Sequence, residues 1–151
     1  MFFLKLGGLV LLLVGFMTET HSTGSVQQVT VVDTGSTNRP GLRVTVDPSG
    51  SATVEQRRGG SRQVKLPRAI VQHLLRDVEA AGPLASLPAR HCFKSASFGS
   101  KLFVEANGAS SPDLSCPSPA DTHLEALVKS AQEVLEAAYT ASGFHKNDII
   151  E

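Results

Sequence analysis

The sequence predicts an α+β fold, a small antiparallel sheet with two amphipathic helices packed on one face. Short segments in which apolar and polar residues alternate, separated by turn-rich stretches, fill the first third of the chain after its N-terminal leader. Two longer segments instead repeat apolar residues at helical spacing. The expected order is β-β-β-(β)-α-β-(β)-α, with the shorter strands in parentheses. Hairpins with helices segregated to one face belong to this class.

The first strands are expected before residue 67. Val26–Val32 is β-branched, and a turn-rich stretch follows it. Leu42–Asp47 alternates cleanly, the turn at 48–50 contains proline and glycine, and Ser51–Arg57 returns. Gln63–Leu66 is a shorter fourth strand. These segments predict a hairpin extended by one strand on either side.

The first helix is expected from Pro67, because a proline at the first helical position loses no hydrogen bond. Its apolar stripe is Ile70, Val71, Leu74, Val78 and Ala81. Gly82 and Pro83 form a stop signal. This segment therefore predicts a helix of about four turns.

After this helix, Leu84–Arg90 is expected to be an irregular link and Lys101–Ala106 a strand that ends at the turn dipeptide Asn107-Gly108. Ser110–Cys116 contains a proline, which favours a loop or an edge strand.

The second helix is expected to start at Ser118 as the N-cap, with Asp121 at the third helical position. Its stripe is Leu124, Leu127, Val128, Ala131, Val134, Leu135 and Ala138. Gly143 is expected to end it.

The N-terminus has the layout of a secretory signal. Lys5 precedes an apolar run of about a dozen residues, Leu6–Met17, and small polar residues follow. A membrane-spanning helix needs about 20 apolar residues, so this run is too short. We therefore expect a signal peptide over 1–24, although cleavage after Ser22 or Ser25 is also acceptable, and a secreted or periplasmic location.

The remaining chain is expected to be one domain over residues 25–143, followed by a flexible tail over 144–151. Removing the first 24 of 151 residues leaves 127, enough for one domain with a real core but not for two.

The two cysteines, Cys92 and Cys116, are predicted to form a disulfide, because an even number in an exported chain favours pairing. The alternative is a metal site that adds His91 and His123. Adjacent ligands such as His91 and Cys92 rarely reach one ion, and there is no Cys-x-x-Cys motif. We therefore expect no metal and no cofactor.

Charge and composition disfavour several kinds of partner. The chain has 14 basic and 14 acidic residues, so no net charge attracts nucleic acid or an anionic membrane. There is no tryptophan and one tyrosine, whereas sites for sugars or single strands use aromatic platforms. We expect another protein as partner, no nucleic acid, and no stable membrane anchor after signal cleavage.

An enzyme is the less favoured hypothesis. The chain has no Gly-x-Ser-x-Gly elbow, Walker loop or His-Glu-x-x-His motif. Catalytic geometry can be absent from sequence spacing, so a small exported hydrolase remains the alternative. It would use a serine with His73, His91 or His123.

The favoured hypothesis is a non-catalytic binding module, and its candidate contact residues are Phe98, Phe103, Arg43 and Arg57. Phe103 is out of phase with the apolar side of its strand, and Phe98 lies in the loop that the disulfide would close. An aromatic presented on a tethered loop is a common contact. Arg43 and Arg57 are expected on the sheet face away from the helices, as a basic docking surface or an ordinary solvated face.

Overall fold

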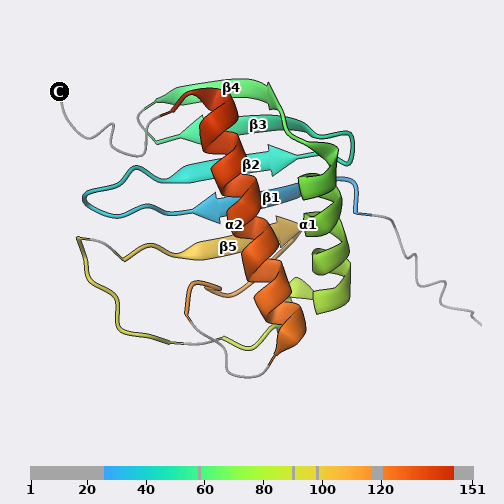
Figure 1. The fold of residues 1–151 in the computed structure, drawn as a ribbon. Coiled ribbons are helices and arrows are strands. Elements are labelled where there is room, and N and C mark those ends of the chain that lie inside the picture. Colours follow the sequence, from blue (N-terminus) through green and yellow to red (C-terminus); the bar gives the residue numbers. More distant parts are fainter. Residues whose placement is uncertain (1–25, 58, 90, 98, 117–120, 145–151) are drawn as a thin grey trace, which may run out of the picture.

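A computed structural model describes residues 26–57, 59–89, 91–97, 99–116 and 121–144 of the chain. These residues form a six-stranded antiparallel sheet and two helices, so the predicted α+β class is confirmed (Figure 1). The elements are β1 Val29–Asp33, β2 Leu42–Val46, β3 Ser51–Gln56, β4 Gly60–Lys65, α1 Arg68–Ala81, the 3₁₀ turn η1 Leu84–Ser86, β5 Leu102–Ala106, β6 Ala109–Ser110 and α2 Thr122–Ser142.

The strands lie in the spatial order β4-β3-β2-β1-β5-β6, with every neighbouring pair antiparallel. The hairpin between β2 and β3 depends on Asp47, whose carboxylate accepts hydrogen bonds from the backbone N–H groups of Ser49 and Ser51 at 2.8 and 3.1 Å. This is a typical aspartate turn. β5 pairs with β1 although β4 and α1 lie between them in sequence, and this long return places the disulfide segment beside the first strand.

The core lies between the sheet and the helices. Val54, Val44, Val31 and Val104 are direct partners across four adjacent strands, and all four are fully buried. Alternation along each strand sends every second side chain to this face, as the sequence pattern predicts. The opposite face of the sheet carries threonines, charged residues and Phe103.

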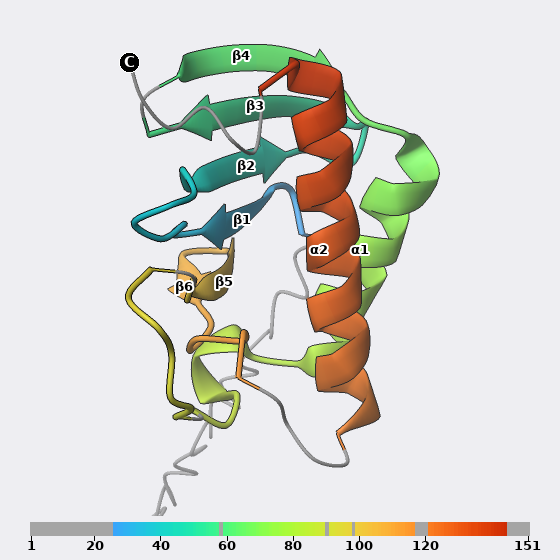
Figure 2. The same cartoon turned by 60° about the vertical axis from the view of Figure 1, so that its left-hand side comes forward.

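The two helices pack against each other on the core face (Figure 2). α1 lies along one side of α2, and the end of β1 and the start of β5 lie on the other side of α2 (Figure 1). α1 ends at Gly82. α2 ends at Gly143, which has a left-handed helical conformation. The sheet is therefore less completely covered on the side of α2 away from α1.

The start of α2 differs from the prediction. Asp121 is the N-cap, and its carboxylate accepts hydrogen bonds from the backbone N–H groups of His123 and Leu124, both at 3.1 Å. Asp121 was expected three residues into the helix, after Ser118. The described helix begins only at Thr122, because the aspartate side chain satisfies its first free N–H groups.

Phe144, which the sequence analysis assigned to the C-terminal tail, is 6% exposed. The Arg62 guanidinium lies 4.5 Å from the centroid of its ring, a cation–π contact. The rest of the predicted tail, 145–151, and the predicted signal peptide, 1–24, lie outside the described residues. Within the described residues, neither helix is long and apolar enough to cross a membrane.

Candidate binding site

The predicted disulfide between Cys92 and Cys116 is present, with the Cα atoms 5.5 Å apart. It joins the segment between η1 and β5 to the segment between β6 and α2. The pairing is compatible with an oxidising compartment. It closes a loop that contains the whole β5–β6 hairpin.

Lys94 is a second anchor in this loop. Its ammonium group donates hydrogen bonds to the carboxylate of Asp113, to the hydroxyl of Ser115 and, at 3.0 Å, to the carbonyl oxygen of Ser100. The Lys94 and Asp113 side chains are 20% and 18% exposed. An ion pair this sheltered from solvent is weakened less by screening than a surface pair.

Asp113 is held in its ionised form. Burial acts to raise the pKa of Asp113, but hydrogen bonds from Lys94 and Ser115 outweigh it and lower the pKa to about 2. Asp113 Oδ1 also accepts the backbone N–H of Leu102 at 3.1 Å. The carboxylate therefore ties the segment before α2 to the first residue of β5.

The loop after β1 borders the same region. Arg39 donates from Nη2 to Oδ2 of Asp33 at 2.5 Å and to the hydroxyl of Ser100 at 2.9 Å. Asp33 Oδ1 accepts the N–H of Gly35 at 2.9 Å. Gly35 has φ +67°, and a β-carbon there would lie 2.4 Å from the carbonyl oxygen of Arg39, so the turn requires glycine.

Two further contacts join this loop to the disulfide loop. Thr37 donates from Oγ1 to the carbonyl oxygen of Ala96 at 3.0 Å. The N–H of Thr34 donates to the carbonyl oxygen of Lys101 at 3.0 Å, and the N–H of Lys101 returns a bond to Thr34 Oγ1 at 2.9 Å. The two loops therefore support each other.

A groove of about 590 Å³ lies between these loops and α2. Its apolar lining is contributed by Leu102, Leu114, Cys116, Leu124, Val128 and Leu135. Its polar and charged lining is Asp33, Arg39, Ser100, Ser115, Glu125, Lys129, Gln132, Glu136 and Tyr139. This volume and mixed lining are typical of ligand sites, although charges of both signs favour neither an anion nor a cation.

Tyr139 is one of the residues that line the groove. Its hydroxyl donates to the carbonyl oxygen of Pro40 at 3.2 Å, and the residue is 5% exposed. Burial, with the nearby charge of Asp33, raises the pKa of Tyr139. The phenol therefore stays neutral at ordinary pH and acts as a hydrogen-bonding support for the loop after β1.

Phe93 is an exposed aromatic of the loop that the disulfide closes. Its relative accessibility is 102%, and it is the one large hydrophobic residue exposed in the described part of the chain. It follows Cys92 and precedes Lys94, so both of its neighbours are anchored. Phe93 is not among the contact residues expected from the sequence. Its position directly after a paired cysteine was the one available signal.

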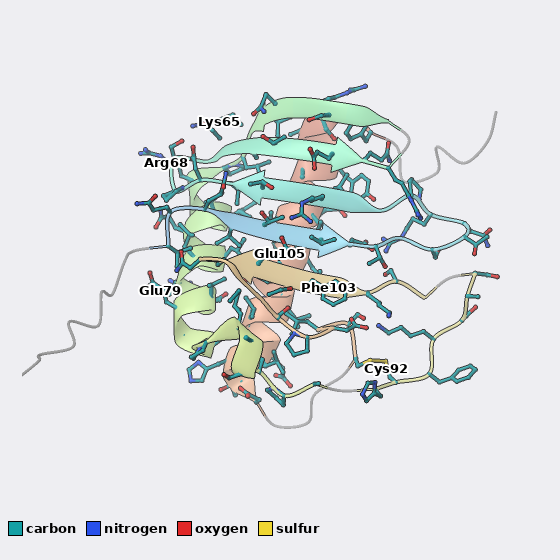
Figure 3. All side chains as sticks on the ribbon, turned by 180° about the vertical axis from the view of Figure 1, so that it is seen from behind. Lys65, Arg68, Glu79, Cys92, Phe103 and Glu105 are labelled. Atoms are coloured by element: carbon teal, nitrogen blue, oxygen red, sulfur yellow. A yellow bond between two sulfur atoms is a disulfide. The ribbon has the colours of Figure 1, made fainter. Side chains whose placement is uncertain are left out.

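The two aromatic candidates from the sequence lie elsewhere. Phe98 is outside the described residues. Phe103 is half-buried on β5, directly opposite Val32 of β1, on the sheet face turned away from the helices (Figure 3). That face is the one opposite the groove.

The two arginine candidates also lie on the side of the sheet that is turned away from the helices. Arg43 Nη2 lies 2.5 Å from Oε2 of Glu105, so much of its charge is neutralised. Arg57 is exposed in the turn after β3, and both arginines line a shallow depression that also contains Glu55. The structure therefore brings Arg43 and Arg57 near each other but separates them from Phe93.

Among the described residues, no serine–histidine pair lines the groove. The described serines that line it are Ser100 and Ser115, and none of His73, His91 and His123 is among its lining residues. Ser115 Oγ is hydrogen-bonded to Asp113 at 2.5 Å and to Lys94. Among the described residues, no group of three or more His, Cys, Asp or Glu side chains is arranged to hold a metal.

Comparison with known proteins adds no family: no protein-family model matches the chain, and a search of curated proteins found no match.

Proposed function

We propose that this protein is an exported, non-catalytic binding module that contacts a protein partner through Phe93. The observation that carries the proposal is the full exposure of Phe93 between two anchored neighbours. Cys92 is held by the disulfide, and Lys94 is held by three hydrogen bonds.

This arrangement lowers the entropic cost of binding. Ordering a loop at an interface costs free energy, and a loop that is already braced avoids much of that cost. A phenylalanine has only two side-chain torsions and a large apolar surface, which suits it to fill a pocket on a partner. Phe93 therefore combines a fixed backbone with a ring that makes no contribution to the core.

The groove extends this contact surface. Ser100 and Ser115 line the groove and are also hydrogen-bond partners of Lys94. A partner that takes Phe93 into a pocket can therefore place its own side chains against Leu114 and Val128 in the groove. An apolar centre with a mixed polar rim is typical of protein interfaces.

Capture from the exported proteins of the source organism tests the proposal. Immobilised wild-type protein should retain a discrete partner, and Phe93→Ala should weaken its capture at least about tenfold, as for an interface hot spot. The variant should lose less than about 0.5 kcal/mol of unfolding free energy, because the ring is exposed.

A matched control distinguishes a specific contact through Phe93 from nonspecific binding by any exposed aromatic ring. Glu79 is exposed on α1, away from the loop (Figure 3). Glu79→Phe in the Phe93→Ala background restores an exposed ring at the wrong place, and we expect no recovery of capture. Equal capture by wild type and Phe93→Ala would reject Phe93 as the contact.

Export is the second part of the proposal. The disulfide supports an oxidising compartment, and the leader-like N-terminus supports a signal peptide. Intact-mass measurement on protein secreted by its own host should give a chain that starts between Thr23 and Val26. A mature protein that begins at Met1 would contradict export by this route.

A further inference from the structure

We propose that β4 is a second docking surface, which binds an extended acidic segment of a partner protein as an additional strand of the sheet. β4, Gly60–Lys65, is the outer strand on one side of the sheet, and among the described strands it pairs with β3 alone. Five of its six residues are exposed, and Val64 is half-buried. Exposed strand edges recruit extended peptides through their unpaired backbone groups.

The register shows which backbone groups face outward. The N–H of Leu66 donates to the carbonyl oxygen of Gly50 at 2.8 Å, which makes this position a hydrogen-bonded pair. Antiparallel ladders alternate between bonded and non-bonded pairs, so Val64, Arg62 and Gly60 direct their N–H and C=O groups toward β3. The backbone groups of Ser61, Gln63 and Lys65 therefore point away from the sheet, and no hydrogen bond within the described part of the chain occupies them.

The described part of the fold leaves this edge accessible. Arg62 directs its side chain to the core side, where its guanidinium donates to the carbonyl oxygen of Ser142 and contacts the ring of Phe144. The side chains of Gln63 and Lys65 lie on the open face, bonded to Thr53 and to serines of the β2–β3 turn. The end of α2 therefore packs beside β4 without covering its outer backbone.

The positive charges around the exposed edge of β4 favour a partner segment that carries acidic residues. Arg57, Lys65 and Arg68 are exposed at the two ends of β4, and Figure 3 shows Lys65 and Arg68 close together at one corner of the sheet. A second copy of the chain would bring these cations against their own counterparts, and like charges at an edge oppose pairing. A strand that carries carboxylates meets them favourably.

A synthetic peptide in which glutamate alternates with valine is the probe. Titrated into the full-length protein, it should slow amide hydrogen exchange at Ser61, Gln63 and Lys65, measured by NMR. Exchange at the amides directed toward β3, such as that of Val64, should change much less. A peptide with lysine in place of glutamate should bind at least about tenfold more weakly, because it meets cations at both ends of the strand.

Gln63→Pro tests the backbone bond directly, with Gln63→Ala as its matched control. Both variants lose the side-chain bond to Thr53, but only proline also removes the outward N–H, and proline is tolerated at an edge position of this kind. We expect Gln63→Ala to bind nearly as wild type and Gln63→Pro to bind at least about fivefold more weakly, the effect of one net hydrogen bond.

Peptide methylated at its alternate amide nitrogens gives the same test without any variant, and it should fail to bind the wild type. Three results would overturn the proposal. They are outward amides already protected in the free protein, equal binding by Gln63→Pro and Gln63→Ala in folded variants, and unchanged binding of the methylated peptide. Protection in the free protein would mean that this chain or a second copy already covers the edge.

Discussion

Lys94 and Asp113, 19 residues apart in sequence, form an ion pair inside the loop that the Cys92–Cys116 disulfide closes. The covalent link and the ion pair hold the same two segments together, one on each side of β5. In sequence, Phe93 lies between Cys92 and Lys94, and its own side chain is fully exposed. Both sequence neighbours of Phe93 are therefore held in place, one by the disulfide and one by the ion pair.

The first prediction concerns pH. Asp113 has a pKa of about 2 in the fold against 3.8 ordinarily. A lowered pKa stabilises the fold above the unfolded value, and this stabilisation is lost as pH falls through the folded value. We expect the unfolding free energy to decline between about pH 4 and pH 2, with Asp113→Asn removing that part of the decline.

Glu79→Gln is the matched control, because it removes an exposed carboxylate on α1. Denaturant unfolding at several pH values gives the unfolding free energies of the wild type, Asp113→Asn and Glu79→Gln. A parallel decline in wild type and Asp113→Asn would show that other carboxylates cause the acid sensitivity.

The second prediction concerns the disulfide. The cysteines are 24 residues apart, and the chain-entropy estimate for closing such a loop is about 3.5 kcal/mol. The double variant Cys92→Ser, Cys116→Ser should therefore lower the melting temperature by roughly 10–15 °C. It should also weaken partner capture at temperatures where it stays folded, because Phe93 loses one of its anchors. Full capture by the folded double variant would show that the disulfide only stabilises the domain.

Much of the fold follows from local periodicity. The alternation of Leu42, Val44 and Val46 is sufficient to orient a strand, because a sheet with one buried face needs apolar residues at every second position. The stripe in α2 fixes its buried side in the same way. The helix start was predicted less well, because Ser118 and Asp121 are both good N-cap residues and the sequence alone does not choose between them.

The candidate site was less predictable, because long-range contacts create it. Asp33, Arg39 and Tyr139 all line the groove, and the Tyr139–Pro40 hydrogen bond joins residues 99 positions apart. The exposed Phe93 precedes Lys94, which forms an ion pair with Asp113, and no spacing rule indicates that pair. Periodicity reports the environment of helices and strands, whereas an irregular loop has no period from which exposure can be inferred.

The third prediction concerns the end of the domain. Phe144 is 6% exposed and packs under Arg62, so its ring belongs to the core although it follows the last helix. Phe144→Ala should cost about 2–3 kcal/mol of unfolding free energy, near the lower limit for a buried phenylalanine because a chain end can relax. Phe93→Ala is the matched comparison, with the same change at an exposed ring. Equal, small losses for both variants would place Phe144 in a loose tail after all.

The last prediction compares two salt bridges of the same length. Arg39 approaches Asp33 and Arg43 approaches Glu105, each at 2.5 Å, but the Asp33 side chain is 8% exposed and that of Glu105 is 35% exposed. An exposed pair contributes less than about 1 kcal/mol, whereas removing one partner from a buried pair leaves an uncompensated charge.

We therefore expect Arg39→Met to cost about 2–3 kcal/mol of unfolding free energy and Arg43→Met less than about 1 kcal/mol, both measured by denaturant unfolding at neutral pH. Methionine keeps most of the aliphatic stem, so the difference reports the charge and its hydrogen bonds. Asp33→Asn combined with Arg39→Met should recover part of the loss, because the buried carboxylate is then gone. No recovery would show that the loss comes from the contact of Arg39 with Ser100 and from loop packing, not from the unpaired charge of Asp33.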